Sequence, residues 1–336
     1  MVVGGKNSLD LLRLIAAILV LYSHQYALGG LPEPSFFGWN SFGGAGVTIF
    51  FFLSGMLVWS SWERDSNWRR FFIRRALRIF PALWVVVLGS VFLLGPFFSA
   101  LPLSAYFADT QTWRYLSTAL LVTRNVLPGV FADNPFPYAV NGSLWTLPVE
   151  FLCYVSIALV GSVKLISRSV LLGIALVLVT LLATYASLVT GVRFSPHFEM
   201  LAVFWFGVFY GYCLAPSRKG LESPQLTIML VVLGLSIFFF LGPRGIERFA
   251  MLCFAAASVH LALNYDFGAK FTDPIGDLSY GVYIFAFPVQ QVVTHWGRKL
   301  DLSFLTLFGL SLLGTSALAY ASWHIVERRA LRFKPK

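Results

Sequence analysis

Long apolar runs constrain this chain more than any other feature of its sequence. Three of them are VVVLGSVFLLGPFF (85–98), VLLGIALVLVTLLATYASLV (170–189) and LTIMLVVLGLSIFFFLG (226–242). A helix needs about 20 apolar residues to cross a hydrocarbon core about 30 Å thick, and each run reaches or approaches that length. The short alternating segments of a membrane β-barrel are not visible. Only 12% of the residues are charged, against about 25% in a soluble domain. We therefore predict an all-α integral membrane protein.

About ten segments are predicted to be transmembrane helices. They are residues 9–28, 44–62, 79–99, 144–161, 169–190, 198–214, 225–241, 247–264, 278–295 and 303–325. The first is interpreted as a retained span, because no signal-peptide cleavage pattern follows it. A long connection rich in proline and aromatic residues occupies 100–143. No internal repeat and no appended soluble domain is visible, so residues 1–336 are predicted to form a single transmembrane domain.

The distribution of lysine and arginine predicts the orientation. If the N-terminus lies in the cytoplasm, the inner segments hold 17 of the 25 basic residues and the outer segments hold 7. Cytoplasmic loops of membrane proteins carry an excess of basic residues. Both termini are therefore predicted to be cytoplasmic and residues 100–143 extracytoplasmic, in a multi-pass protein of the plasma (inner) membrane. The net charge of +10 then reflects topology and calls for no nucleic-acid partner.

Two ionisable residues share one face of the first predicted helix. Arg13 and His24 are eleven residues apart, which makes about three turns plus 20° and about 16 Å along the axis. Arg13 is expected about one turn inside the cytoplasmic surface, and His24 about one turn from the outer surface. Arg13 can extend toward the cytoplasm and pair with Asp10, and His24 can be interfacial. On a common face, the two residues instead indicate a cavity that crosses the membrane, where such groups are usually placed.

Glu150 is a second ionisable residue predicted within the membrane. It lies in NGSLWTLPVEFLCY (141–154), about six residues below the outer end of the fourth helix. His24 is expected at a similar depth, so the two side chains could meet in one cavity. A carboxylate that is hydrogen-bonded to an imidazole fixes its tautomer and raises its basicity. The alternative is that Glu150 pairs with another, structural partner.

The segment ERDSNWRRFFIRRALRIFPALW (63–84) is a strongly basic inner loop. Arg74, Arg75 and Arg78 lie close together on it, and Arg74 and Arg78 share a helical face. The loop can be basic for topological reasons alone. Six arginines and no lysine favour a phosphate site instead, because the guanidinium fork matches phosphate oxygens. Before this loop, Ser54 and Gly55 are predicted to permit close helix packing.

Five motifs in order carry a resemblance to a known family. They are LDLLRLIAAILVLYSH, IFFFLSGML with FFIRRALRIFPALW, GSLWTLPVEF, DLSYGVYIFAFPVQQ and VERRALRF. With ten predicted spans, the chain resembles membrane acyltransferase family 3, the multi-span O-acyltransferases of envelope and exported glycans. Many members have a histidine where this chain has Ala286, which excludes a second catalytic histidine there. Arg328 and Arg329 replace the usual Lys-Pro after the last span, a change in a surface segment.

The resemblance implies transfer of an acyl group, usually acetyl, from cytoplasmic acyl-CoA to a hydroxyl of an extracytoplasmic glycan. His24 is predicted to be the general base, oriented by Glu150, and Arg13 to guide the donor. Candidate donor-binding residues are Arg74, Arg75 and Arg78 for the phosphates, and Tyr280 and Tyr283 as hydroxyl donors unless they serve packing alone. No metal is implied. Direct transfer and an acyl-histidine intermediate both remain open, as do the acyl chain and the oligomeric state.

Other functions and acceptors also remain open. A transporter or flippase for a saccharide or lipid-linked glycan would use a similar cavity, although no repeated halves are visible. A purely structural subunit is disfavoured by the cost of buried charge. The acceptor could be O-antigen lipopolysaccharide, exopolysaccharide, peptidoglycan, a glycosylated small molecule or a lipid-linked sugar. Aromatic residues of 100–143 could stack on sugars or anchor in membrane lipids. His197, His260, His295 and His324, and the three cysteines, are predicted to have no catalytic role.

Overall fold

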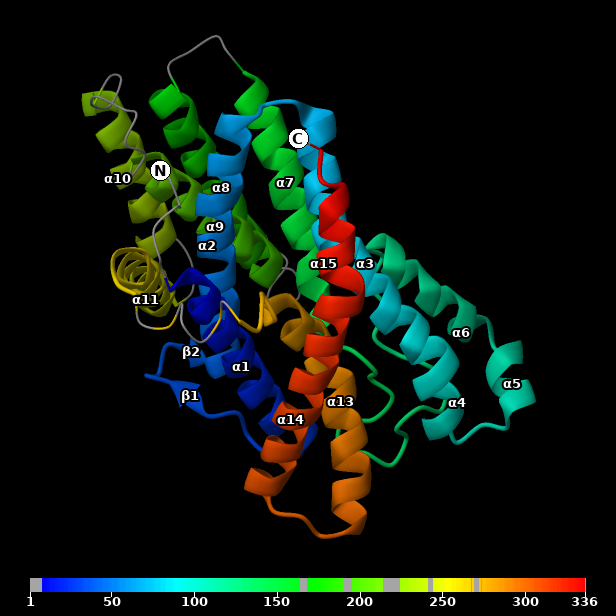
Figure 1. Cartoon of the computed structure of the whole chain (residues 1–336). Coiled ribbons are helices and arrows are strands. Elements are labelled where there is room, and N and C mark those ends of the chain that lie inside the picture. The colour runs from blue at the N-terminus through cyan, green and yellow to red at the C-terminus, as the bar shows by residue number, and fades with distance from the viewer. Residues whose placement is uncertain are drawn as a thin grey trace.

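The computed structural model describes residues 8–163, 168–189, 195–213, 224–240, 244–266, 268, 272 and 274–335. Each of the ten predicted segments is helical within these residues (Figure 1). The helices are α1 (Leu9–Leu28), α2 (Phe42–Arg64), α3 (Trp68–Gly89), α7 (Thr146–Ser162), α8 (Arg168–Val189), α9 (Ser195–Cys213), α10 (Pro224–Phe240), α11 (Gly245–Asn264), α13 (Ser279–Lys299) and α14 (Phe304–Ser322).

Seven helical stretches of the described residues are long and apolar enough to cross a membrane. They are Leu9–Leu28, Phe42–Arg64, Trp68–Phe98, Ser143–Ser162, Arg168–Ala186, Gly245–Asn264 and Phe304–Phe333. The chain is therefore a helical, multi-pass membrane protein. The predicted spans that end at residues 190, 214 and 241 extend just outside the described residues. Six of the basic residues that were predicted to be cytoplasmic also lie outside them: Lys6, Lys164, Arg218, Lys219, Lys270 and Lys336.

The predicted basic loop is mostly helix, which corrects the predicted start of the third span at residue 79. Only residues 65–67 separate α2 from α3. The Asn67 side chain accepts a hydrogen bond from the Arg70 amide and so begins α3, as N-cap residues do. Arginine is a good helix former, so the helix continues from the arginine-rich segment into the apolar one. Five of the six arginines consequently have fixed directions on the first turns of a helix.

Short elements complete the fold. A π-helical turn at Ser90–Leu94 joins α3 to α4 (Gly95–Phe98). The connection of residues 100–143 contains α5 (Leu103–Ala108) and α6 (Thr110–Arg114), which project from the side of the bundle (Figure 1). After α1, β1 (Ser35–Phe36) and β2 (Asn40–Ser41) form an antiparallel hairpin. α15 (Arg328–Ala330) follows α14, and the C-terminus lies at the same end as the α2–α3 turn (Figure 1).

Glycines bring α2 into close contact with its neighbours. A Cβ atom on Gly55 would lie 2.0 Å from the Phe204 carbonyl oxygen of α9, and one on Gly46 would lie 2.3 Å from the Ala16 carbonyl oxygen of α1. Backbones approach this closely only where side chains are absent. The prediction of close helix packing is therefore confirmed at Gly55, and α2 is held between α1 and α9.

Buried amides join the connection to α13. The Gln291 side chain donates to the Ala139 carbonyl at 2.6 Å and to the Phe136 carbonyl at 2.8 Å, and it accepts from Asn134 at 2.7 Å. Asn141 donates to the Ile284 carbonyl at 2.8 Å. Buried polar groups need such partners, so these contacts fix the path of the connection into α7.

Candidate active site

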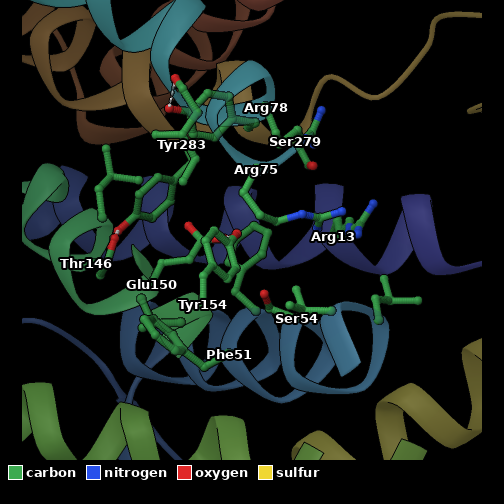
Figure 2. Close-up of a pocket in the computed structure, with 17 residues that line it drawn as sticks. Arg13, Phe51, Ser54, Arg75, Arg78, Thr146, Glu150, Tyr154, Ser279 and Tyr283 are labelled. Atoms are coloured by element: carbon green, nitrogen blue, oxygen red, sulfur yellow. Dashed lines mark hydrogen bonds between the residues drawn. The ribbon is translucent and has the colours of Figure 1, made fainter. Parts of the chain in front are cut away.

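Two cavities meet inside the bundle. The first, here called the arginine cavity, measures about 130 Å³ and includes Arg13, Arg75, Arg78, Glu150, Tyr154 and Tyr280 in its lining (Figure 2). The second, here called the histidine cavity, measures about 310 Å³ and includes His24, Glu33, Trp39, Trp145, Glu199 and Arg248. The two linings share Val47 of α2 and Tyr283 of α13. Arg13 and His24 of α1 thus belong to two adjacent cavities.

Arg75 is the central cation of the arginine cavity. Its guanidinium lies over the rings of Phe71 and Tyr154, with centroid distances of 5.9 Å and 5.8 Å, which is cation–π geometry. Its Nε atom is buried without a hydrogen-bond partner in the described part of the chain. Within those residues no carboxylate pairs with it. Arg75 is therefore available to an anionic or carbonyl ligand.

Asp277 joins the other two arginines of this cavity. Its Oδ2 atom accepts from Arg78 of α3 at 2.6 Å and from Arg13 of α1 at 3.3 Å. The Ser279 hydroxyl donates to its Oδ1 atom at 2.6 Å. Burial opposes ionisation of this carboxyl, but Arg78 and Arg13 hold its pKa well below its usual range. Asp277 was not among the predicted site residues; the only signal for it in the sequence is its place in the DLSYG motif.

Arg74 lies outside the arginine cavity. Its Nη1 atom donates to Asp65 Oδ2 at 2.7 Å, and Arg70 makes two hydrogen bonds to the same carboxylate. These hydrogen bonds lower the pKa of Asp65. Of the three arginines predicted to bind phosphates, Arg75 and Arg78 line the cavity. Arg74 is turned toward the α2–α3 corner by its pairing with Asp65.

The two predicted tyrosines both line the arginine cavity, and their hydroxyls are engaged. Tyr280 donates to the Ile79 carbonyl at 2.7 Å. Tyr283 donates to the Ser143 carbonyl at 2.8 Å, and its oxygen lies 2.8 Å from Thr146 Oγ1. The hydroxyls therefore tie α13 to α3 and to the start of α7.

Glu150 and His24 are not hydrogen-bonded, so the predicted carboxylate–imidazole pair is wrong. Glu150 lines the arginine cavity and accepts a hydrogen bond from Tyr154, one turn along α7. His24 lines the histidine cavity, with its Nδ1 atom buried and without a partner in the described residues. Equal depth from the helix ends did not bring them together, because the wall that contains Tyr283 lies between the two cavities.

Aromatic and oppositely charged side chains surround His24. Phe287 lies edge-on to its ring at a centroid distance of 5.3 Å. Trp39 and Trp145 line the same cavity. The Ser23 hydroxyl donates to Glu33 at 2.8 Å. Trp39, Glu33 and Trp145 were not among the predicted site residues, because only tertiary packing brings the segment after α1 and the residues before α7 beside His24.

Helices α9 and α11 contribute a further charged pair to the histidine cavity. Arg248 Nε lies 3.8 Å from Glu199 Oε1, too far for a hydrogen bond. The Arg248 side chain is 7% exposed, and its Nε and Nη1 atoms have no hydrogen-bond partner within the described residues. These N–H groups are therefore available to a ligand.

The comparisons with known proteins agree on one family. The profile of the acyltransferase domain family matches residues 6–324. The chain belongs to membrane acyltransferase family 3. The predicted resemblance is confirmed, and the protein is an acyltransferase. It is 35% identical to the O-acetyl transferase of Shigella phage Sf6 over 335 residues, which is 98% of both chains. No solved structure matches this acyltransferase significantly.

Two more distant relatives extend the comparison. The acyltransferase is 27% identical to nodulation protein 10 of Rhizobium leguminosarum bv. viciae, over 98% of this chain and 95% of that protein. It is 30% identical to the peptidoglycan O-acetyltransferase OatA of Listeria monocytogenes over 150 residues, which is 43% of this chain and 22% of that protein.

Two of the remaining histidines of this acyltransferase have polar partners outside the two cavities. His260 Nδ1 is 2.8 Å from the Tyr210 hydroxyl, and His295 Nδ1 is 3.3 Å from Asn134 Oδ1. In the part of the chain that the structure describes, no group of three His, Cys, Asp or Glu side chains is arranged to hold a metal ion. His24 is the histidine that lines a cavity next to the arginine cavity.

Proposed function

We propose that this acyltransferase moves an acetyl group from cytoplasmic acyl-CoA to a hydroxyl of an extracytoplasmic glycan, in the inner membrane. One observation carries the proposal: a cationic cavity and a cavity with His24 and two tryptophans meet at a common wall. A donor with phosphates suits the first cavity, and an uncharged polyhydroxyl acceptor suits the second.

Charge supports acyl-CoA as the donor. Arg75 and Arg78 line the arginine cavity, and Lys334 lies near them at the C-terminus. Burial and repulsion from Arg75, Arg78 and Arg74 lower the pKa of Lys334. Cations gathered against their mutual repulsion are stabilised when a polyanion binds. The diphosphate and the further phosphate of coenzyme A would supply this negative charge, at the end of the protein where the α2–α3 turn lies.

The lining of the histidine cavity supports a glycan acceptor. Trp39 and Trp145 offer apolar faces, while Glu33, Glu199 and Arg248 offer acceptors and donors. Sugar hydroxyls both donate and accept hydrogen bonds, so a mixed set of charged groups beside aromatic rings suits them better than it suits a charged ligand. The O-acetyl transferase of phage Sf6 and the peptidoglycan O-acetyltransferase OatA act on hydroxyls by their names, which favours the same reaction class here.

In this proposal His24 acts as the general base. Its ring lines the cavity proposed for the acceptor, where it would take the proton of the attacking hydroxyl. The hydroxyl oxygen bonds to the thioester carbonyl carbon, the carbon–sulfur bond breaks, and the proton passes from His24 to the leaving thiolate. Arg13 would guide the donor, together with Arg75 and Arg78. Glu150 accepts a hydrogen bond from Tyr154 and faces Arg75, so it would act in the cavity proposed for the donor.

Reconstituted protein tests this proposal. Proteoliposomes supplied with acetyl-CoA and an envelope glycan fraction are expected to release coenzyme A and yield acetylated glycan, as detected by mass spectrometry. His24→Ala is expected to lower the rate at least ~100-fold, the usual contribution of a general base. His260→Ala is the matched control, because His260 contacts Tyr210 away from both cavities. Unchanged acetylation by folded His24→Ala would contradict the assignment, and glycan transport without acetyl-CoA would indicate a transporter.

A further inference from the structure

The wall between the two cavities is thin and has few components. Val47 and Tyr283 line both cavities. The wall also includes the start of α7, where Trp145 lines the histidine cavity and the next residue, Thr146, lines the arginine cavity. A group that moves from one cavity to the other therefore has to pass between α2, α13 and the first turn of α7.

Tyr283 is held rigidly on its side of the wall. Its hydroxyl donates to the Ser143 carbonyl and contacts Thr146 Oγ1, both at 2.8 Å. Its ring meets Phe50 edge-on at a centroid distance of 5.8 Å, and the residue is 7% exposed. Figure 2 shows Tyr283 and Thr146 at the same end of the arginine cavity. A ring fixed at both its edge and its hydroxyl moves aside only when those contacts break.

On the opposite side of the wall, the position of Val47 is fixed by the packing of α2. Gly46, the preceding residue, has its Cα against the Ala16 carbonyl of α1, where an added Cβ would lie 2.3 Å from the oxygen. α2 also contacts α9 closely at Gly55. The backbone of α2 therefore cannot shift to widen the passage, and the side chain of Val47 sets its width. β-Branching restricts that side chain to few rotamers.

We propose that Val47 and Tyr283 form a size filter that selects the acyl chain of the donor. This inference rests on the proposed function. The thioester end of the donor reaches the wall from the arginine cavity, and a short acyl group passes between Val47 and Tyr283 toward the hydroxyl near His24. A longer chain meets the fixed Tyr283 ring or the Val47 methyl groups. Both are specificity-determining residues, because neither exchanges a proton or a bond in the reaction.

The expected selectivity is measurable. Pockets that discriminate by one methylene usually do so by about 10-fold to 200-fold in kcat/KM. The wild-type protein is therefore expected to use acetyl-CoA at least ~10-fold better than butyryl-CoA. Val47→Ala removes two methyl groups from the wall and is expected to raise the butyryl-to-acetyl ratio of kcat/KM at least ~10-fold. Val47→Ile adds one methylene and is expected to lower the propionyl-to-acetyl ratio by a similar factor.

A second variant tests the tyrosine side of the wall. Tyr283→Phe keeps the ring but removes its contacts with Ser143 and Thr146, so the ring can turn aside. The butyryl-to-acetyl ratio of kcat/KM is expected to rise ~5-fold or more. Val282→Ala is the control for packing loss, because Val282 is 1% exposed, lies next to Tyr283, and faces a core cluster with Ala17 and Ala319 away from both cavities.

The outcomes separate this inference from the proposed function. If wild-type protein transfers acetyl groups and all three variants fold but keep the wild-type chain-length ratios, the size filter is refuted while acyl transfer stands. If Val282→Ala changes the ratios as much as Val47→Ala does, general loosening explains the effect and the filter is also refuted. Opposite shifts from Val47→Ala and Val47→Ile, without a shift from Val282→Ala, support it. Absence of acyl transfer in the wild type would refute the proposed function itself.

Discussion

At the scale of single residues, Asp277 organises the arginine cavity. Two guanidiniums from helices far apart in sequence converge on one of its oxygens. The carboxylate sets where Arg13 and Arg78 lie, while Arg75 has no carboxylate partner among the described residues. This shared carboxylate lowers the repulsion between Arg13 and Arg78 and leaves Arg75 for the phosphates that the proposed acyl-CoA donor would bring.

Asp277→Asn is expected to destabilise the protein by about 2–3 kcal/mol, because two partly buried guanidiniums lose their shared partner. Thermal unfolding in detergent at neutral pH measures this. Asp10→Asn is the matched control: Asp10 also pairs with Arg13, but its side chain is 52% exposed, against 15% for Asp277. Its loss is expected to cost under about 1 kcal/mol. Equal effects of the two changes would contradict the organising role of Asp277.

Ionisation of the Asp277 carboxyl makes the stability of the protein depend on pH, with a direction that follows from its pKa. The pKa of Asp277 is lower in the folded protein than its usual value, so its ionised form stabilises the fold. That stabilisation is present above about pH 4, the usual aspartate pKa, and is lost as pH falls further. Between about pH 4 and 7 the difference in stability between wild type and Asp277→Asn is therefore expected to stay constant.

At the scale of elements, α2 depends on its glycines. Gly55→Ala would place a Cβ atom 2.0 Å from the Phe204 carbonyl, so α2 and α9 would have to separate. A loss of about 3 kcal/mol or more is expected, since overpacking at a backbone contact cannot relax by rotating a side chain. Gly309→Ala on α14 is the control, because nothing lies within 4 Å of its added Cβ atom. A similar melting temperature for both variants would contradict this packing account.

Helix positions could be predicted well, and contacts between helices could not. The apolar runs located the ten long helices of the described residues, because length and hydropathy are properties of consecutive residues. The predicted start of α3 was wrong, because the helix begins in the arginine-rich segment, before the apolar run on which the prediction rested. The Glu150–Tyr154 contact was predictable from its spacing of four residues. Trp39, Glu199 and Arg248 were not, because only tertiary packing brings their segments beside His24.

At the scale of the whole molecule, the charge bias predicts which end faces the cytoplasm. In a background without the three native cysteines, Ser66→Cys between α2 and α3 is expected to react with an impermeant maleimide only after the membrane is opened. Ser35→Cys in β1 is expected to react in intact cells, because the two exposed positions lie at opposite ends of α2. Labelling of Ser66→Cys alone in intact cells would reverse the predicted orientation. Labelling of both variants in intact cells would refute it.

The amide contacts between the connection and α13 also set an order of assembly. Asn134 bonds to Gln291, which follows it by 157 residues. At a synthesis rate of about 5–20 residues per second, the connection leaves the ribosome roughly 8–30 seconds before its partner exists. During that interval its buried amides have only water or lipid headgroups to bond with. The nascent chain is therefore most exposed to membrane proteases while α8 to α11 are being inserted, and the arrival of α13 ends that exposure.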